Sequence, residues 1–152
     1  MPDPNDRFGR FVRSVPGPDE EYECHGGRLR VVAVDINEAS VIVRWRLTGE
    51  LDLAAAFPEE TQQLEREISG LDVWAAERVT SKALRDLRAR YLFGFGLEDD
   101  LGTPYARRNL TAGGVGEKTG DARYCPAPPP NATTLNFKWL DVRIDIPLKD
   151  HT

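Results

Sequence analysis

The sequence reads Leu135-Asn-Phe-Lys-Trp139 and then Val142-Arg-Ile-Asp-Ile-Pro-Leu148, and in both runs apolar residues alternate with polar ones. Alternation with a period of two is typical of antiparallel strands that bury one face. The apolar residues of the two runs fall in opposite frames, and a slip of one residue turns every side chain to the other face of a sheet. We therefore expect either a bulge or a very tight connection near Trp139-Leu140.

Turn-forming residues precede these runs. Asp99-Asp-Leu-Gly102 predicts a turn, because aspartates accept hydrogen bonds from nearby backbone and glycine tolerates positive φ. Pro126–Pro130 cannot donate to a β ladder, so we expect it to cross between sheets or to follow an edge. The β pattern returns from Tyr91, with a strand at Thr103–Asn109 and a mobile glycine-rich loop at Ala112–Gly120. Short strands between such turns predict an antiparallel sandwich.

A hairpin is predicted nearer the amino terminus, from strand Arg28–Ile36 through the turn Asn37-Glu38 into a second strand. In the second strand, apolar side chains share one face and polar ones share the other, which is typical of a half-buried strand. The apolar set is Val41, Val43, Trp45 and Leu47, and the polar set is Arg44, Arg46 and Thr48. Residues 1–21 are rich in proline and charge, and we expect an extended arm there.

The middle of the chain departs from the β pattern. Pro58, followed by two glutamates, predicts a helix start, since proline suits the first turn and acidic residues there oppose the helix dipole. Thr80 or Ser81 is the expected cap of a second helix. Apolar residues at helical spacing support both helices: Leu64, Ile68 and Leu71 in the first, and Leu84, Leu87 and Tyr91 in the second. We predict a helical insertion around residues 58–90, within a segment 50–90.

The charges of the two helical runs are opposite. Residues 50–67 carry six acidic side chains and one arginine, whereas residues 77–90 carry five basic and two acidic ones. Either the helices pack side by side and partly neutralise one another, or the basic helix docks an acidic partner. Charge runs most often form solvated faces, so the internal pairing is favoured.

The composition indicates one globular domain spanning residues 1–152, with 40% hydrophobic and 30% charged residues. A net charge of −5 gives no general attraction for nucleic acid or for an anionic membrane. No signal-peptide core and no apolar run of about 20 residues is present, so the cytoplasm is the expected location. The basic residues are 16 arginines and four lysines, a ratio associated with GC-rich bacterial coding.

Cys24 and Cys125 are the two cysteines, and free thiols are the favoured interpretation. A disulfide between them would imply export. With His25 they could instead supply three zinc ligands, but no Cys-x-x-Cys pair and no good fourth ligand exist, since His151 lies at the terminus. We expect no metal and no cofactor.

Two further motifs bear on catalysis. Gly113-Gly-Val-Gly-Glu-Lys-Thr-Gly120 resembles a phosphate-binding loop, but Ala112 and Glu117 stand where that loop needs glycines. Glu98, Asp99 and Asp100 are the densest acidic cluster, and paired carboxylates can act as acid and base. Neighbours on a strand point to opposite faces, so turn formation is favoured over catalysis. A hydrolase or carbohydrate-processing enzyme using this cluster is the alternative.

The turn Asp99-Asp-Leu-Gly-Thr-Pro-Tyr105, the prolines at 126–130 and the Leu-x-Phe to Ile-x-Ile-Pro-Leu ending resemble immunoglobulin-like β-sandwich domains of unknown function in bacterial proteins. In such domains a turn of the form Asp-Asp-x-Gly-x-x-Tyr precedes a strand, and a proline-rich segment precedes the closing strands. The resemblance covers residues 28–48 and 91–148. It implies a mainly β sandwich without known catalytic residues.

These observations predict a non-enzymatic protein-interaction module. Binding is expected through an exposed sheet edge or through the helical insertion. A symmetric homodimer through an unpaired edge is a further possibility. No catalytic, cofactor or metal residues are assigned. The candidate interaction surface consists of arginines from the predicted hairpin and the basic helix: Arg44, Arg46, Arg85 and Arg88.

Overall fold

The computed structural model describes residues 8–114 and 117–148. The described part of the chain is mainly β, with 45% of its residues in strands and 26% in helices. The strands are β1 (Phe11–Pro16), β2 (Tyr22–Cys24), β3 (Gly27–Asn37), β4 (Val41–Gly49), β5 (Phe95–Asp99), β6 (Ala106–Gly113), β7 (Lys118–Cys125), β8 (Thr134–Trp139) and β9 (Val142–Pro147). The helices are α1 (Leu53–Ala56), α2 (Pro58–Ile68) and α3 (Val73–Phe93).

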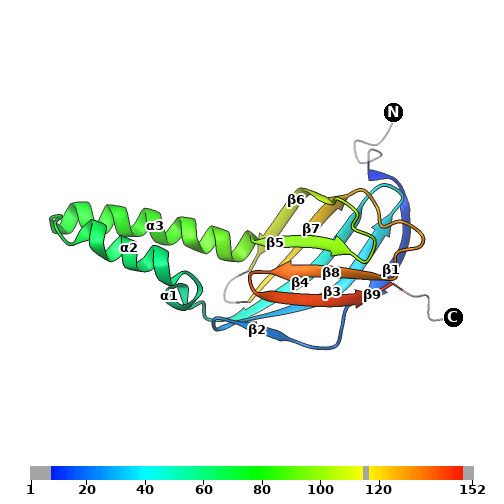
Figure 1. Cartoon of the computed structure of the whole chain (residues 1–152), viewed down its shortest axis with the longest axis horizontal. Coiled ribbons are helices and arrows are strands. Elements are labelled where there is room, and N and C mark those ends of the chain that lie inside the picture. The colour runs from blue at the N-terminus through cyan, green and yellow to red at the C-terminus, as the bar shows by residue number, and fades with distance from the viewer. Residues whose placement is uncertain (1–7, 115–116, 149–152) are drawn as a thin grey trace.

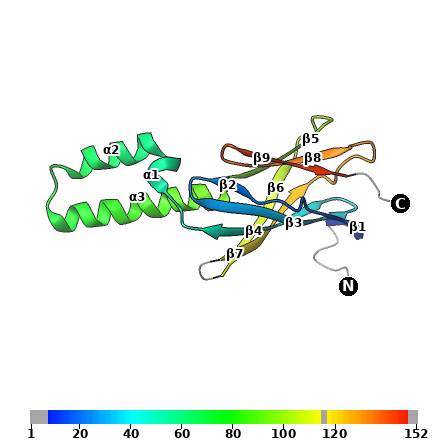
Figure 2. The same cartoon turned by 90° about the horizontal axis from the view of Figure 1, so that it is seen from below.

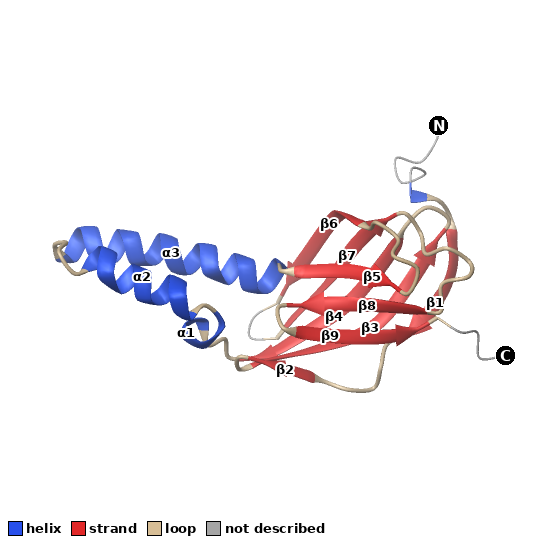
Figure 3. Cartoon of the chain, in the orientation of Figure 1, coloured by secondary structure: helices blue, strands red, loops and turns tan. Residues whose placement is uncertain are grey.

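The strands form two antiparallel sheets. The larger sheet has the order β1-β3-β4-β7-β6, with the short β2 paired to one end of β3, and the smaller sheet has the order β5-β8-β9. The two sheets face one another as layers (Figure 2). The helices α2 and α3 form a hairpin that projects from one end of the layers (Figure 1; Figure 3).

Aromatic side chains fill the space between the sheets. The Trp45 ring, from β4, lies 5.1 Å from the Phe95 ring of β5, and Phe95 in turn stacks on Phe137 of β8 at 4.9 Å between centroids. The inward-facing residues predicted on β4 are buried, and so are those of β8 and β9 apart from Val142, which is half-buried. Burial of this apolar surface provides the main driving force for joining the two layers.

The β8–β9 connection explains the two frames seen in the sequence. Trp139 pairs with Val142, so Leu140 and Asp141 alone form the turn, and Leu140 adopts a positive φ of 51°. Residues on both sides of this turn therefore point into the same core, including Phe137 and its partner Ile144. The prediction of a very tight connection is confirmed. The predicted β3–β4 hairpin is confirmed as well, with Ile36 paired to Val41.

The helical hairpin differs from its prediction at two boundaries. Its start at Pro58 is confirmed. The predicted cap at Thr80 or Ser81 is wrong, because α3 begins at Val73, where the Asp72 carboxylate accepts a hydrogen bond from the Ala75 amide at 2.8 Å. The return to β structure at Tyr91 is also wrong. The helix continues to Phe93 and ends at Gly94.

The structure also corrects the segment before the prolines. The strand expected at Thr103–Asn109 lies instead at Ala106–Gly113, as β6. The expected glycine-rich loop at 112–120 is largely a β6–β7 hairpin, because Gly113 pairs with Thr119, whereas residues 115–116 lie outside the described part of the chain. The prolines do cross between the sheets, from β7 to β8. Within the expected extended arm, β1 forms an edge of the larger sheet.

Candidate interaction surface

One side of α3 carries a row of exposed basic residues that begins with a tryptophan. The members follow one another at intervals of three or four residues, which places them on the same side of a helix. All of them are exposed, and Trp74 retains 79% of its accessible surface. We call this row the α3 face: Trp74, Arg78, Lys82, Arg85 and Arg88.

The four cations of the α3 face have no charged partner in the described part of the chain. Between α2 and α3 the ion pair found there joins Arg90 to Glu60 at 3.6 Å, near the base of the hairpin, where the Arg90 guanidinium also lies over the Phe57 ring. The expected partial neutralisation of the two helices is therefore limited to Arg90. The acidic residues of α2 leave the α3 face uncompensated.

The far end of the hairpin adds exposed apolar surface. Leu71 lies in the turn between α2 and α3 with 43% exposure, and Val73 and Trp74 in the first turn of α3 are each 79% exposed. Water-exposed clusters of large apolar side chains at one end of a protein often mark a contact site. Trp74 belongs both to this end and to the α3 face.

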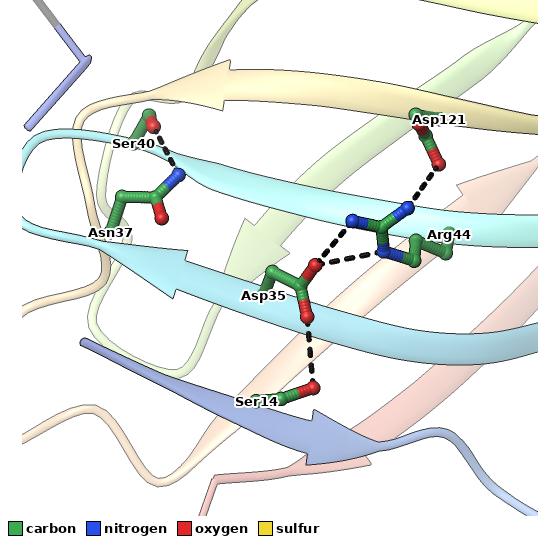
Figure 4. Close-up of polar contacts among 6 residues, drawn as sticks. All are labelled: Ser14, Asp35, Asn37, Ser40, Arg44 and Asp121. Carbon is green, nitrogen blue, oxygen red and sulfur yellow. Dashed lines mark hydrogen bonds and ion pairs between the residues drawn. The ribbon is translucent and has the colours of Figure 1, made fainter. Parts of the chain in front are cut away.

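The other two arginines of the predicted surface are neutralised within the larger sheet. Figure 4 shows the Arg44 guanidinium between two carboxylates, donating to Asp35 on β3 at 2.8 Å and to Asp121 on β7 at 3.4 Å. Asp35 also accepts from the Ser14 hydroxyl of β1 at 2.8 Å, so this network connects four neighbouring strands. Arg46 pairs with Glu117 in the same way. Arg44 and Arg46 thus stabilise the sheet face, whereas Arg85 and Arg88 have no such partner within the described ranges.

Glu98, Asp99 and Asp100, the acidic cluster, each make different structural contacts. Asp99 ends β5 and accepts hydrogen bonds from the Leu101 amide at 2.9 Å, the Thr103 amide at 3.0 Å and the Tyr105 hydroxyl at 2.8 Å. Gly102 completes this turn with a φ of 75°. The first carboxylate therefore fixes its own turn, which favours the turn-forming interpretation of the cluster.

The neighbouring carboxylates have different partners. Asp100 accepts from the Thr133 amide at 3.0 Å and the Thr133 hydroxyl at 2.8 Å, which ties the turn to the segment that leads into β8. Glu98 pairs with Lys138 across the β5–β8 ladder at 2.7 Å. With its three carboxylates bonded to three different groups, this cluster has the arrangement of structural residues.

These contacts also shift proton affinities. Burial by itself would raise the pKa of Asp99, but hydrogen bonds from Thr103, Tyr105 and Leu101 outweigh it and hold that pKa below its ordinary value. The pKa of Asp100 is lowered chiefly by its bonds to Thr133. Low pKa values keep both groups ionised near neutral pH, which suits hydrogen-bond acceptors and not a general acid.

Replacing Asp99 by asparagine is expected to lower the free energy of unfolding by about 2 kcal/mol at pH 7, since a buried charged acceptor is lost. Because the pKa of Asp99 is lowered by folding, its stabilisation is complete well above the ordinary value of 3.8 and is lost as the pH falls through the folded value. Urea unfolding at pH 7 and at pH 3 gives the free energy of unfolding of both proteins. The difference between wild type and Asp99→Asn should be smaller at pH 3 than at pH 7. Glu98→Gln, on an exposed ion pair, is the control and should change little. A larger difference in the free energy of unfolding at pH 3 would contradict the role of ionised Asp99 as the acceptor in this turn.

The cysteines and histidines form no metal centre in the described part of the chain. Cys24 and Cys125 are both free thiols, and no group of three or more His, Cys, Asp or Glu residues in the described ranges is placed to hold a metal ion. His25 lies 3.6 Å from the Asp141 carboxylate. Burial is the main cause of the raised pKa of the Cys24 thiol, and a buried, protonated thiol is a poor nucleophile. His151 lies outside the described residues.

Only two of the five residues of the α3 face are in the candidate surface predicted from the sequence. Those two are Arg85 and Arg88. Trp74 and Arg78 precede the expected cap at Thr80 or Ser81, so the predicted helix does not contain them. Lys82 lies within the predicted helix but is not in the predicted surface. The signal that could have found them is the spacing of residues 74, 78 and 82 after a capping aspartate. Among the described residues, no helix is both long and apolar enough to cross a membrane.

No family model and no curated protein matches this chain. Among solved structures, it is similar to the crystal structure of the conserved domain protein from Bacillus anthracis, with 18% sequence identity and a TM-score of 0.44. The alignment covers 82% of this chain and 32% of that chain. A similarity of this size assigns neither a fold family nor an activity.

Proposed function

We propose that this chain is a non-enzymatic, immunoglobulin-like β-sandwich of the bacterial cytoplasm that binds an acidic surface of a partner protein through the α3 face. The observation that carries the proposal is the row of four exposed cations on α3, which begins with an exposed tryptophan. None of the four is paired with an acidic side chain among residues 8–114 and 117–148. Arginine and tryptophan are the residues most enriched among the contacts that dominate protein binding.

Several features of the fold support the rest of this proposal. Two facing antiparallel sheets joined by an aromatic core are the arrangement that a sandwich requires. The two free thiols suit a reducing compartment. The separate hydrogen-bonding roles of Glu98, Asp99 and Asp100 suit a protein without a catalytic carboxylate pair.

The charge distribution favours a protein partner over nucleic acid. The chain has a net charge of −5, and the acidic helix α2 lies beside the basic helix. A phosphate backbone would be repelled by much of this surface, whereas a local acidic patch on a protein needs only the exposed side of α3. Opposite charge on the two surfaces would also orient the partners as they approach.

The test is affinity capture with purified bait from a bacterial lysate, with quantitative mass spectrometry of the bound proteins. The charge-reversal variant carries Arg78→Glu, Lys82→Glu and Arg85→Glu. The matched control carries Arg28→Glu, Arg108→Glu and Arg143→Glu, three exposed arginines of the strands with the same change in net charge. We expect a defined acidic protein to be captured by wild type and control, and its recovery to fall about tenfold or more with the α3 variant.

Equal recovery of that protein by the α3 variant and the control would contradict the proposal. Capture that disappears after nuclease treatment would contradict it too, because the bound species would then be nucleic acid. Trp74→Ala provides a second variant that leaves every charge in place. It should also weaken capture, since an exposed tryptophan gains most of its contact energy only in a complex.

A further inference from the structure

A cavity of about 350 Å³ lies where the base of α3 meets the end of the larger sheet. Its apolar walls come from the end of β4, from the segment after it and from the last turn of α3: Leu47, Leu51, Tyr91 and Leu92. The volume falls at the lower end of the range found for small-molecule sites. Mostly apolar walls with a few polar groups are the usual composition of such sites.

Among the residues that the structure describes, two cations and no carboxylate complete the lining. Arg88 comes from α3, one turn before Tyr91 and Leu92, and Lys118 is the first residue of β7. Arg88 has no ionic or hydrogen-bonding partner in the described part of the chain. Three acidic residues adjoin the lining in sequence. Glu117 is paired with Arg46, and Asp52 accepts from the Ala55 amide. Glu50 is exposed and is not among the described residues that line the cavity.

The position of Lys118 is unusual for a lysine. It pairs directly with Leu47, so its side chain starts from the core-facing side of the sheet, in the same row as Gly120, Ala122 and Tyr124. It is half-buried there, and its ammonium group has one long hydrogen bond, to the Gly114 carbonyl at 3.5 Å. A partly buried cation without a counter-ion is unfavourable, and an anionic ligand would relieve this.

The wall formed by Tyr91 is fixed before any ligand arrives. Its hydroxyl donates to the Cys24 carbonyl at 2.6 Å, and its ring meets the Trp139 ring edge to face at 5.0 Å. The Trp139 indole N–H in turn donates to the Tyr91 carbonyl at 2.8 Å. Because both the hydroxyl and the carbonyl of Tyr91 are hydrogen-bonded, this side of the cavity is already ordered. A ligand therefore loses no affinity to the cost of ordering it.

We propose that this cavity binds a small organic carboxylate with an apolar body. The carboxylate lies between Arg88 and Lys118, and the body packs against Leu47, Leu51 and Leu92. Arginine matches a carboxylate through paired N–H donors, while the leucines exclude water from the rest of the ligand. Arg88 belongs both to the α3 face and to this cavity. The test of the protein partner changes Arg78, Lys82 and Arg85 and leaves Arg88 in place, so either proposal can fail without the other.

The test uses octanoate as the probe, with octanamide as its uncharged counterpart and acetate as the charged group without the apolar body. Calorimetry gives the affinities, and amide NMR shifts at Gly27 and Gly49 locate the site. We expect saturable octanoate binding, with octanamide and acetate each weaker by about tenfold or more. The double variant Arg88→Gln, Lys118→Gln should lose a similar factor. Arg66→Gln, at an exposed arginine of α2 outside the cavity and the α3 face, should bind octanoate as wild type does.

Three results would overturn the proposal. One is the absence of saturable octanoate binding to the wild-type protein. Another is equal binding of octanoate and octanamide, which would show that the charge has no role. Equal binding of octanoate and acetate would likewise show that the apolar body has no role. The last is unchanged octanoate affinity in the double variant. The comparison of octanoate, octanamide and acetate is made on wild-type protein. It therefore tests the proposed binding of a carboxylate with an apolar body even if the double variant does not fold.

Discussion

Replacing Trp139 by alanine is expected to lower the free energy of unfolding by about 3–5 kcal/mol. Trp139 ends β8 with no exposed surface, and it pairs with Phe95 across the ladder. Removing its ring leaves a cavity against the Tyr91 ring, and the Tyr91 carbonyl loses the indole N–H that donates to it. Both losses fall at the point where α3 joins the smaller sheet, so the helical hairpin and the β layers should be destabilised together.

Trp74→Ala is the matched control for this measurement. It removes the same side chain from a position that is 79% exposed, so the free energy of unfolding should change by less than about 0.5 kcal/mol. Urea unfolding followed by far-ultraviolet circular dichroism compares the two without relying on tryptophan fluorescence. Trp139→Phe separates the two contributions, because it keeps most of the ring and loses the N–H. We expect it to cost about 1–2 kcal/mol. If both alanine variants were equally stable, the assignment of Trp139 to the core would be wrong.

The Trp139–Tyr91 contact also shows where sequence reasoning succeeded and where it failed. Trp139 was placed correctly, because its run alternates clearly and a local pattern was enough. The sequence pattern predicts that β structure returns at Tyr91, although this residue also follows Leu84 and Leu87 at helical spacing. Two local periodicities overlap there, and the choice between them is made by burial against Trp139, which lies 48 residues away. The helix and strand propensities of the residues around Tyr91 carry no information about that distant contact.

The candidate surface was only partly predictable for a similar reason. The basic character of the second helix could be read from the sequence, and so could Arg85 and Arg88. Whether those charges pair with α2 depends on how the two helices are rotated about their axes, which no spacing within one helix specifies. Likewise, the alternation of β4 places Arg44 on the outer face. Its partner Asp121 comes from β7, a strand that the sequence does not predict and whose first three residues were expected to lie in a loop.

Gly120→Ala is expected to lower the free energy of unfolding by about 3 kcal/mol, through overpacking. Gly120 lies in β7 between Trp45 of β4 and Ala112 of β6. A Cβ atom there would lie 2.0 Å from the Thr111 carbonyl oxygen and 2.5 Å from the Trp45 ring. Neither is the free end of a flexible side chain, so the strands themselves must separate. This close approach also explains why a glycine occupies this position in the inner row of β7.

Gly113→Ala tests this explanation within the same hairpin. Gly113 is the last residue of β6, and a Cβ added there meets no atom within 4 Å. Its alanine variant should be as stable as wild type, or slightly more stable because the unfolded chain loses freedom. Urea unfolding of the two variants therefore compares one chemical change in two environments. Similar stabilities would mean that β7 does not pack against Trp45 as described. Since Lys118 starts the same strand, such a result would also remove the geometric basis for placing its side chain beside Leu47.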